Sequence, residues 1–164
     1  MKMLWLLAVL PCLALGAAGS PDASFYKSLA AGGLAEVDLG KLAAEKASNQ
    51  SVKDFGSRMV KDHSAADEEL KSLADSKHVS LPSSPGTAAH TKKAELEVLS
   101  GEHFDKSYVS NQVKAHQQTV ALLKKEIASG SDPDARAFAQ KVLPTIESHL
   151  KAADQLADTL GVKH

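Results

Sequence analysis

The sequence predicts an all-α protein whose core is a four-helix bundle. Aromatic residues make up only 4% of the 164 residues, whereas Ala, Leu, Lys, Glu and Asp are abundant, a composition that favours helices over strands. Four long segments have the apolar spacing of amphipathic helices. Glycines, prolines and capping residues separate these segments into two hairpins and one long connection.

Residues 1–19 are expected to be a Sec signal peptide. Lys2 is followed by an apolar run from Leu4 to Leu15 and by small residues at 16–19, where a signal peptidase can cleave. The run is short for a membrane-spanning helix, although an uncleaved anchor stays an alternative. Lipidation at Cys12, the single cysteine, is a minor alternative because Pro11 stands where a small residue is needed. The mature domain is therefore expected to comprise residues 20–164, without a thiolate ligand, in the periplasm.

The helix limits follow from capping residues. We expect long helices at 22–47, at 103–129 and at 133–160, and one more that follows Asn49 or Ser51 as N-cap and runs to about residue 77. Gly130 ends the third helix, Asp132 caps the fourth, and Pro133 suits its first position. The tight breaks near residues 48–51 and 130–132 make each pair an antiparallel hairpin.

The long connection between the hairpins sets the predicted topology. It contains Pro82, Pro85 and Gly86, and a short helix is expected from Thr91 to Leu99. Roughly 25 residues suffice to run the length of the bundle, and two hairpins joined by such a crossover form the ferritin-like arrangement. An up-down-up-down bundle with a flexible insert is the alternative.

Each predicted long helix carries one ionisable residue in an apolar stripe. These residues are Glu36, His63, His116 and His149. Their neighbours three, four and seven positions away are mostly apolar or small, which places the side chains toward the core. All four lie near mid-helix, so we expect them to meet in one layer.

Three imidazoles and one carboxylate suit one divalent transition-metal ion such as Zn, Fe, Mn or Cu. Asp67 and Gln112, one turn from His63 and His116, are candidates for orienting the ligands, and Asp62 and Asp105 are weaker candidates. The alternative is a metal-free polar layer in which the carboxylate pairs with the histidines and fixes helix register.

Four segments, in order along the chain, resemble the family called domain of unknown function 4142. They are residues 30–37, 55–63, 101–109 and 143–150, and the resemblance extends over about Ser24–Leu160. The family comprises ferritin-like exported bacterial proteins, often labelled as outer membrane or membrane proteins. The resemblance therefore implies a ferritin-like bundle and export, but no activity.

The sequence departs from the ligand pattern of ferritin-like di-iron proteins. Those proteins use Glu-x-x-His on two helices and a Glu on each of the other two. Here Val60 and Ile146 stand three residues before His63 and His149, and Gln112 stands one turn before His116. One carboxylate is too few to balance two iron ions, so ferroxidase or oxygenase activity is not expected.

These observations lead to a functional prediction. The net charge of −1 with mixed signs provides no basic surface for nucleic acid, and no mature segment is apolar enough to span a membrane. We expect an envelope-associated protein that binds one metal ion, with no catalytic residue assigned. A metal-free structural or stress-related protein that acts through protein partners is the alternative, and a mononuclear metalloenzyme is a third hypothesis. The sequence identifies no partner or substrate.

Overall fold

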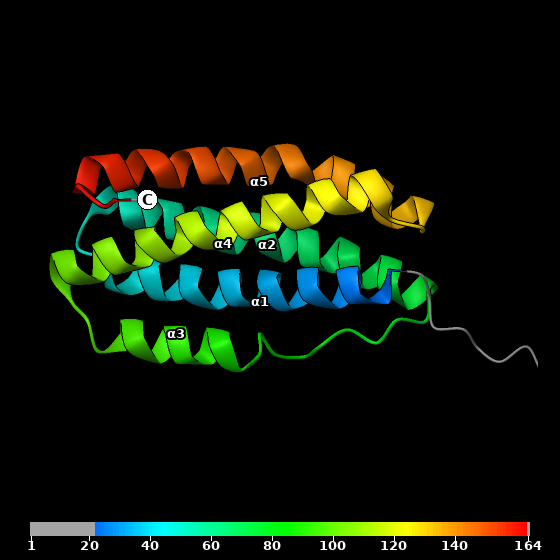
Figure 1. Cartoon of the computed structure of the whole chain (residues 1–164). Helices are drawn as coiled ribbons and strands as arrows, with labels where there is room; N and C mark the ends of the chain where they lie inside the picture. The colour runs from blue at the N-terminus through cyan, green and yellow to red at the C-terminus, as the bar shows by residue number, and fades with distance from the viewer. Residues whose placement is uncertain (1–21, 164) are drawn as a thin grey trace, which may run out of the picture.

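The computed structural model describes residues 22–163, which form five α-helices and no strand (Figure 1). The helices are α1 (Ala23–Lys46), α2 (Gln50–Ser76), α3 (Thr87–Glu97), α4 (Gly101–Ser129) and α5 (Pro133–Leu160). The all-α prediction is therefore confirmed for this part of the chain. The predicted signal peptide lies outside the described residues. Within them, no helix combines the length and the apolar character needed to cross a membrane.

The predicted caps define the starts of two helices. Asn49 caps α2 by accepting a 2.8 Å hydrogen bond from the Ser51 backbone N–H, and Asp132 caps α5 by accepting one of 3.0 Å from Asp134. The other limits shift slightly. The α4 helix begins at Gly101, two residues earlier than expected, and α3 begins at Thr87, four residues earlier.

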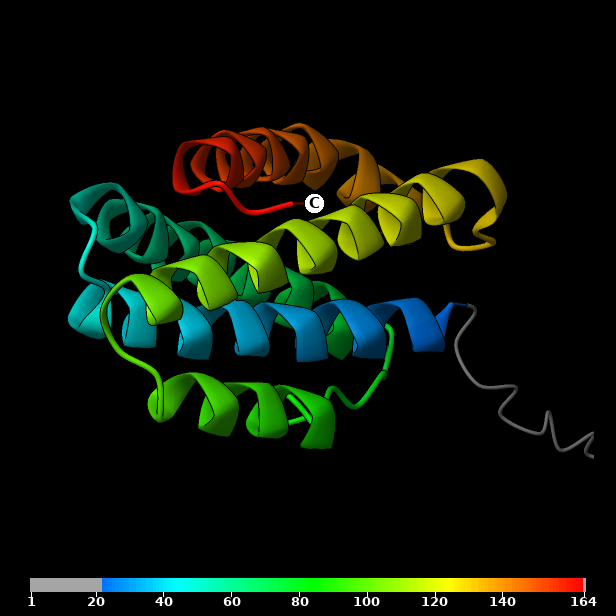
Figure 2. The ribbon, with the colours of Figure 1, turned by 60° about the vertical axis from the view of Figure 1, so that its left-hand side comes forward.

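Four long helices lie side by side, and α3 lies against one face of the group (Figures 1 and 2). The α1 and α2 helices pack as one hairpin and α4 and α5 as the other, while α1 contacts α4 and α2 contacts α5. The connection from α2 returns along the outside of α1, so α2 and α4 run in the same direction (Figure 1). The α3 helix contacts both α1 and α4.

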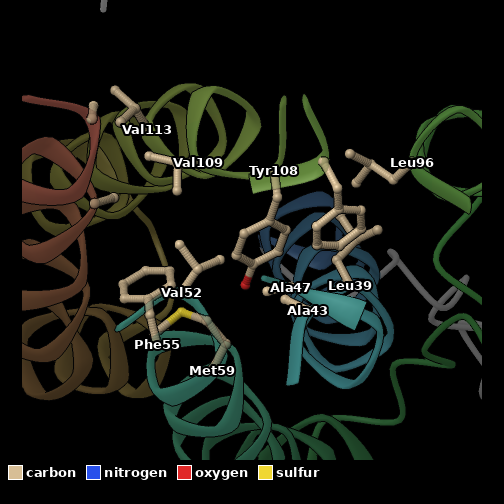
Figure 3. Close-up of a cluster of buried hydrophobic side chains, with 13 residues drawn as sticks. Leu39, Ala43, Ala47, Val52, Phe55, Met59, Leu96, Tyr108, Val109 and Val113 are labelled. Atoms are coloured by element: carbon tan, nitrogen blue, oxygen red, sulfur yellow. The ribbon is translucent and has the colours of Figure 1, made fainter. Parts of the chain in front are cut away.

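The core consists of two hydrophobic clusters at opposite ends of the bundle. One cluster includes Leu39, Met59, Val109 and Ala153, and two of its three aromatic residues, Phe55 and Tyr108, face each other across the core (Figure 3). The other cluster includes Tyr26, Leu70, Leu123, Phe138 and Ile146. On every long helix, the ionisable residue singled out above lies between the segments that contribute to the two clusters. A polar layer therefore divides the apolar core.

Each hairpin turn is held by a carboxylate from the other hairpin. Asp105 on α4 accepts hydrogen bonds from the backbone N–H groups of Ser48 and Asn49, at 3.0 and 2.9 Å, and from the Ser48 hydroxyl. At the opposite end, Asp22 accepts 2.6 Å hydrogen bonds from the backbone N–H groups of Ser131 and Asp132. These contacts fix the register of the two hairpins at both ends.

The α1 and α2 backbones touch at two glycines. A Cβ atom on Gly40 would lie 2.7 Å from the carbonyl oxygen of Gly56, and one on Gly56 would lie 2.8 Å from that of Gly40. Both distances are too short for a Cβ contact, so the helices approach this closely only because both side chains are hydrogen. Gly32, also on α1, differs because its Cβ would meet nothing within 4 Å.

This difference predicts opposite effects of the same substitution. Gly40→Ala should destabilise the protein by about 1–3 kcal/mol because the helices must separate. Gly32→Ala should stabilise it by up to about 1 kcal/mol because alanine favours a helix and meets no obstacle. Denaturant unfolding of both variants measures these free energies, and equal effects would show that the glycine contact does not set the helix spacing.

Candidate metal centre

The four ionisable residues in the middle of the long helices are all buried. The exposed fractions are 7% for Glu36, 7% for His63, 1% for His116 and 0% for His149. They come from α1, α2, α4 and α5, respectively. The polar layer between the two hydrophobic clusters is therefore formed by one residue of each long helix.

The three histidines form a compact cluster. One nitrogen of each ring lies within 4.8 Å of one nitrogen of both other rings. The ring centroids are 5.8 Å apart for His63 and His116, 5.5 Å for His63 and His149, and 5.5 Å for His116 and His149. Glu36 is not part of this group. It lies beside the group, where it lines a cavity together with His63.

Hydrogen bonds fix the orientation of two rings. Nε2 of His149 lies 2.8 Å from Oδ2 of Asp62, and Nδ1 of His116 lies 2.9 Å from the backbone carbonyl oxygen of Gln112. A carboxylate and a carbonyl oxygen can only accept, so these two ring nitrogens carry the protons. The opposite nitrogens, Nδ1 of His149 and Nε2 of His116, then hold lone pairs.

Neither lone pair has a partner in the protein, and a third ring nitrogen of the cluster lacks a partner as well. Nε2 of His63, Nε2 of His116 and Nδ1 of His149 are buried and make no hydrogen bond. Buried polar atoms in native proteins are almost always satisfied, so three such atoms in one cluster require an explanation. One explanation is a metal ion bound by these three nitrogens. In such sites a carboxylate commonly accepts a hydrogen bond from the other nitrogen of a ligating imidazole.

Burial keeps the histidines neutral. Removal from water, together with the neighbouring imidazoles, lowers the pKa of His63 to about 3. Burial also lowers the pKa of His116 to about 4 and that of His149, although the Asp62 carboxylate opposes the shift at His149. Neutral imidazole is the form that binds a metal, so the cluster is in the binding form at physiological pH.

Burial has the opposite effect on Glu36, because it disfavours the charged form of a carboxyl group. It raises the pKa of Glu36 to about 7, although the nearby Gln112 side chain offsets part of this shift. The Oε2 atom of Glu36 is buried without a hydrogen-bond partner. Glu36 can therefore be neutral or charged near physiological pH.

The supporting residues differ from the predicted ranking. Asp62, a weaker candidate, makes the contact with His149, whereas Asp67 packs on Gly33 of α1, in the space where a side chain of residue 33 would lie. Gln112 supports His116 through its backbone carbonyl rather than its side chain. Asp105 holds the α1–α2 turn instead. No sequence signal separated Asp62 from Asp67, because the choice depends on which side of α2 faces α5.

Comparisons with known proteins agree with this fold. The family described as "Domain of unknown function (DUF4142)" matches residues 12–156. Among solved structures, a DUF305 fragment from Deinococcus radiodurans has a TM-score of 0.71 at 14% identity, over 85% of this chain and 95% of that chain. CopM in the Cu(II)-bound form has a TM-score of 0.68 at 14% identity, over 84% and 96%. At this identity the likeness shows the fold alone. No curated protein matches.

The raised pKa of Glu36 predicts how stability depends on pH. Between pH 4.5, its usual pKa, and about 7, the folded protein holds a proton on Glu36 that the unfolded chain has released, so the native state loses stability as pH rises through this window. Glu36→Gln removes this titration. The melting temperature of the variant minus that of the native protein should therefore increase from pH 4.5 to 7 and then level off. Thermal melts of both proteins in the presence of chelator measure this difference. A difference that stays constant between pH 4.5 and 7 would contradict the effect of burial on Glu36.

Proposed function

Since the chain belongs to the DUF4142 family, whose description assigns no activity, we propose its function from the site: it is an exported ferritin-like bundle protein that binds one transition-metal ion in its core. The ligands are His63, His116 and His149. Glu36, which the sequence suggested as a fourth protein ligand, lies outside the three-histidine group. We therefore assign it the position next to the ion rather than a fixed bond to it.

The observation that carries this proposal is the set of three buried ring nitrogens without a partner. A metal-free polar layer would need a hydrogen-bond partner for each of them, because an unsatisfied buried polar atom costs about 1–3 kcal/mol. None of the three nitrogens has such a partner among the described residues. One cation satisfies all three lone pairs at once, which favours metal binding over the metal-free layer.

The three nitrogen ligands narrow the choice of metal ion. Imidazole nitrogen suits Zn, Cu, Fe and Ni, and affinity for such sites generally rises toward Cu(II). The absence of a carboxylate from the three-histidine group argues for one ion rather than a di-iron pair. One protein of similar fold, CopM, was solved in a Cu(II)-bound form. Cu(II) is therefore the first ion to test, with Zn(II) second.

Metal should stabilise the folded protein because the unfolded chain has no preformed site. At a free ion concentration about 100 times the dissociation constant, we expect the melting temperature to rise by about 5–10 °C. Melting curves of tag-free protein with Cu(II), with Zn(II) and with chelator measure this rise, and elemental analysis measures the stoichiometry.

Histidine variants identify the ligands. His63→Ala and His149→Ala should abolish the metal-dependent rise, whatever their own melting temperatures. His90→Ala should retain it, because His90 is exposed on α3 and belongs to no cluster found among residues 22–163. No stoichiometric metal and no rise with either ion would leave the metal-free layer.

The Asp62 carboxylate should tune the affinity through His149. Asp62→Asn keeps the shape of the side chain but removes the charge that orients and polarises the imidazole, so the metal dissociation constant should increase by roughly 10- to 100-fold. Glu69→Gln is the matched control, since Glu69 also lies on α2 and pairs with Lys141 instead. Competition titrations against a chelator measure both, and equal affinities for the two variants would remove Asp62 from the site.

Export is the second part of the proposal. It is supported by the charged, apolar and small-residue regions of residues 1–19. The protein is then periplasmic and begins between Ala17 and Ser20. N-terminal sequencing of the protein from the periplasmic fraction tests this, and a start at Met1 or a lipid-modified Cys12 would contradict it.

A further inference from the structure

A cavity beside the histidine cluster provides space for a small molecule next to the proposed metal ion. It has a volume of about 50 Å³ and is lined by Glu36 and His63 together with apolar side chains that include Leu70, Phe138 and Ile146. A cavity that holds one water molecule needs about 10–15 Å³, so this cavity can hold a molecule of two or three heavy atoms.

One end of the cavity is polar. Oε2 of Glu36 is buried there without a hydrogen-bond partner, and His63, one of the three proposed ligands, forms part of the wall. Three protein nitrogens leave at least one coordination position of a transition metal for an external ligand. The cavity would therefore provide a ligand with a metal at one side and with polar groups of Glu36, Asp67 and Thr119, while apolar side chains form much of the remaining wall.

The cavity adjoins a wider groove on the surface. Gly32, Glu36 and Thr119 line both this cavity and a wider groove between α1, α3 and α4. Gly32 is exposed, and no neighbouring atom requires a glycine at that position. A glycine inside a helix costs about 1 kcal/mol relative to alanine, and here no close backbone contact explains it, in contrast to Gly40 and Gly56. Gly32 instead leaves free space where the cavity and the groove share their lining.

We propose that this cavity admits a small external ligand of two or three heavy atoms, such as a linear anion or a diatomic molecule, to the metal ion, and that the ligand enters past Gly32. This inference rests on the metal site proposed above. Under this proposal the metal ion reacts with or senses a small molecule, rather than being stored in a closed site.

A second groove offers a rival entry. It lies between α2 and α5 and is lined by Asp62, His63, Thr145 and His149, among others. On that side Asp62 already holds His149, and the ion pair between Lys141 and Glu69, 2.7 Å long, belongs to the same groove. No buried carboxyl oxygen without a partner lies in this groove, whereas Oε2 of Glu36 is such an atom in the cavity beside Gly32. We therefore assign entry to the Gly32 side.

The test uses azide on the Cu(II)-loaded full-length mature protein. Azide has three heavy atoms, and its binding to Cu(II) produces a charge-transfer absorption that can be followed by stopped flow. Gly32→Leu should slow or weaken azide binding by roughly tenfold or more, since interiors are close-packed and the added side chain occupies the free space at Gly32. Copper affinity should be unchanged. Leucine also favours the helix more than glycine, so loss of the fold does not account for the effect.

Two variants serve as controls. Gly32→Ala gains helix propensity but leaves this space open, and Thr145→Leu fills the rival groove; both should bind azide at nearly the native rate. Bound copper without any azide absorption would overturn this inference alone. A native azide rate in Gly32→Leu, or a slow rate confined to Thr145→Leu, would overturn the entry route. Failure to bind copper at all would instead overturn the proposed function, and this inference with it.

Discussion

The structure depends on a polar layer that must close inside an apolar core. Each long helix contributes one buried ionisable residue to this layer, and on each helix this residue separates the two hydrophobic clusters. Such a layer is stable only when its members meet at the same depth, because a shift of one hairpin along the other would place histidines against the apolar side chains of a neighbouring cluster. The glycine contact between α1 and α2 and the carboxylates that hold both turns serve this alignment.

Much of the fold was readable from the sequence because its signals are local. Asn49, Asp132 and Pro133 identified two helix starts through their own side chains, and those starts were found where expected. The α3 helix was placed four residues too late. Pro85 and Gly86 mark where a helix cannot continue, but they do not show how soon the next one begins, and Thr87 starts α3 directly after them.

The site was readable only in part. The apolar neighbours of His63, His116 and His149 show that each side chain faces inward, and these three do meet. Glu36 faces inward too, yet it lies beside the group. The apolar face of one helix shows that a side chain points toward the core, but which side chains it meets there depends on how the helices pack against one another. The contact between Asp62 and His149 joins residues 87 positions apart, and no local pattern encodes it.

The carboxylate contacts at the two turns have a consequence for how the chain is connected. Asp105 of the second hairpin recognises the turn of the first, and Asp22 of the first recognises the turn of the second. Neither set of hydrogen bonds involves a residue of the segment 78–100, which joins the hairpins. Two fragments, each with one hairpin, are therefore expected to associate noncovalently in the native register and to rebuild the histidine cluster across their interface.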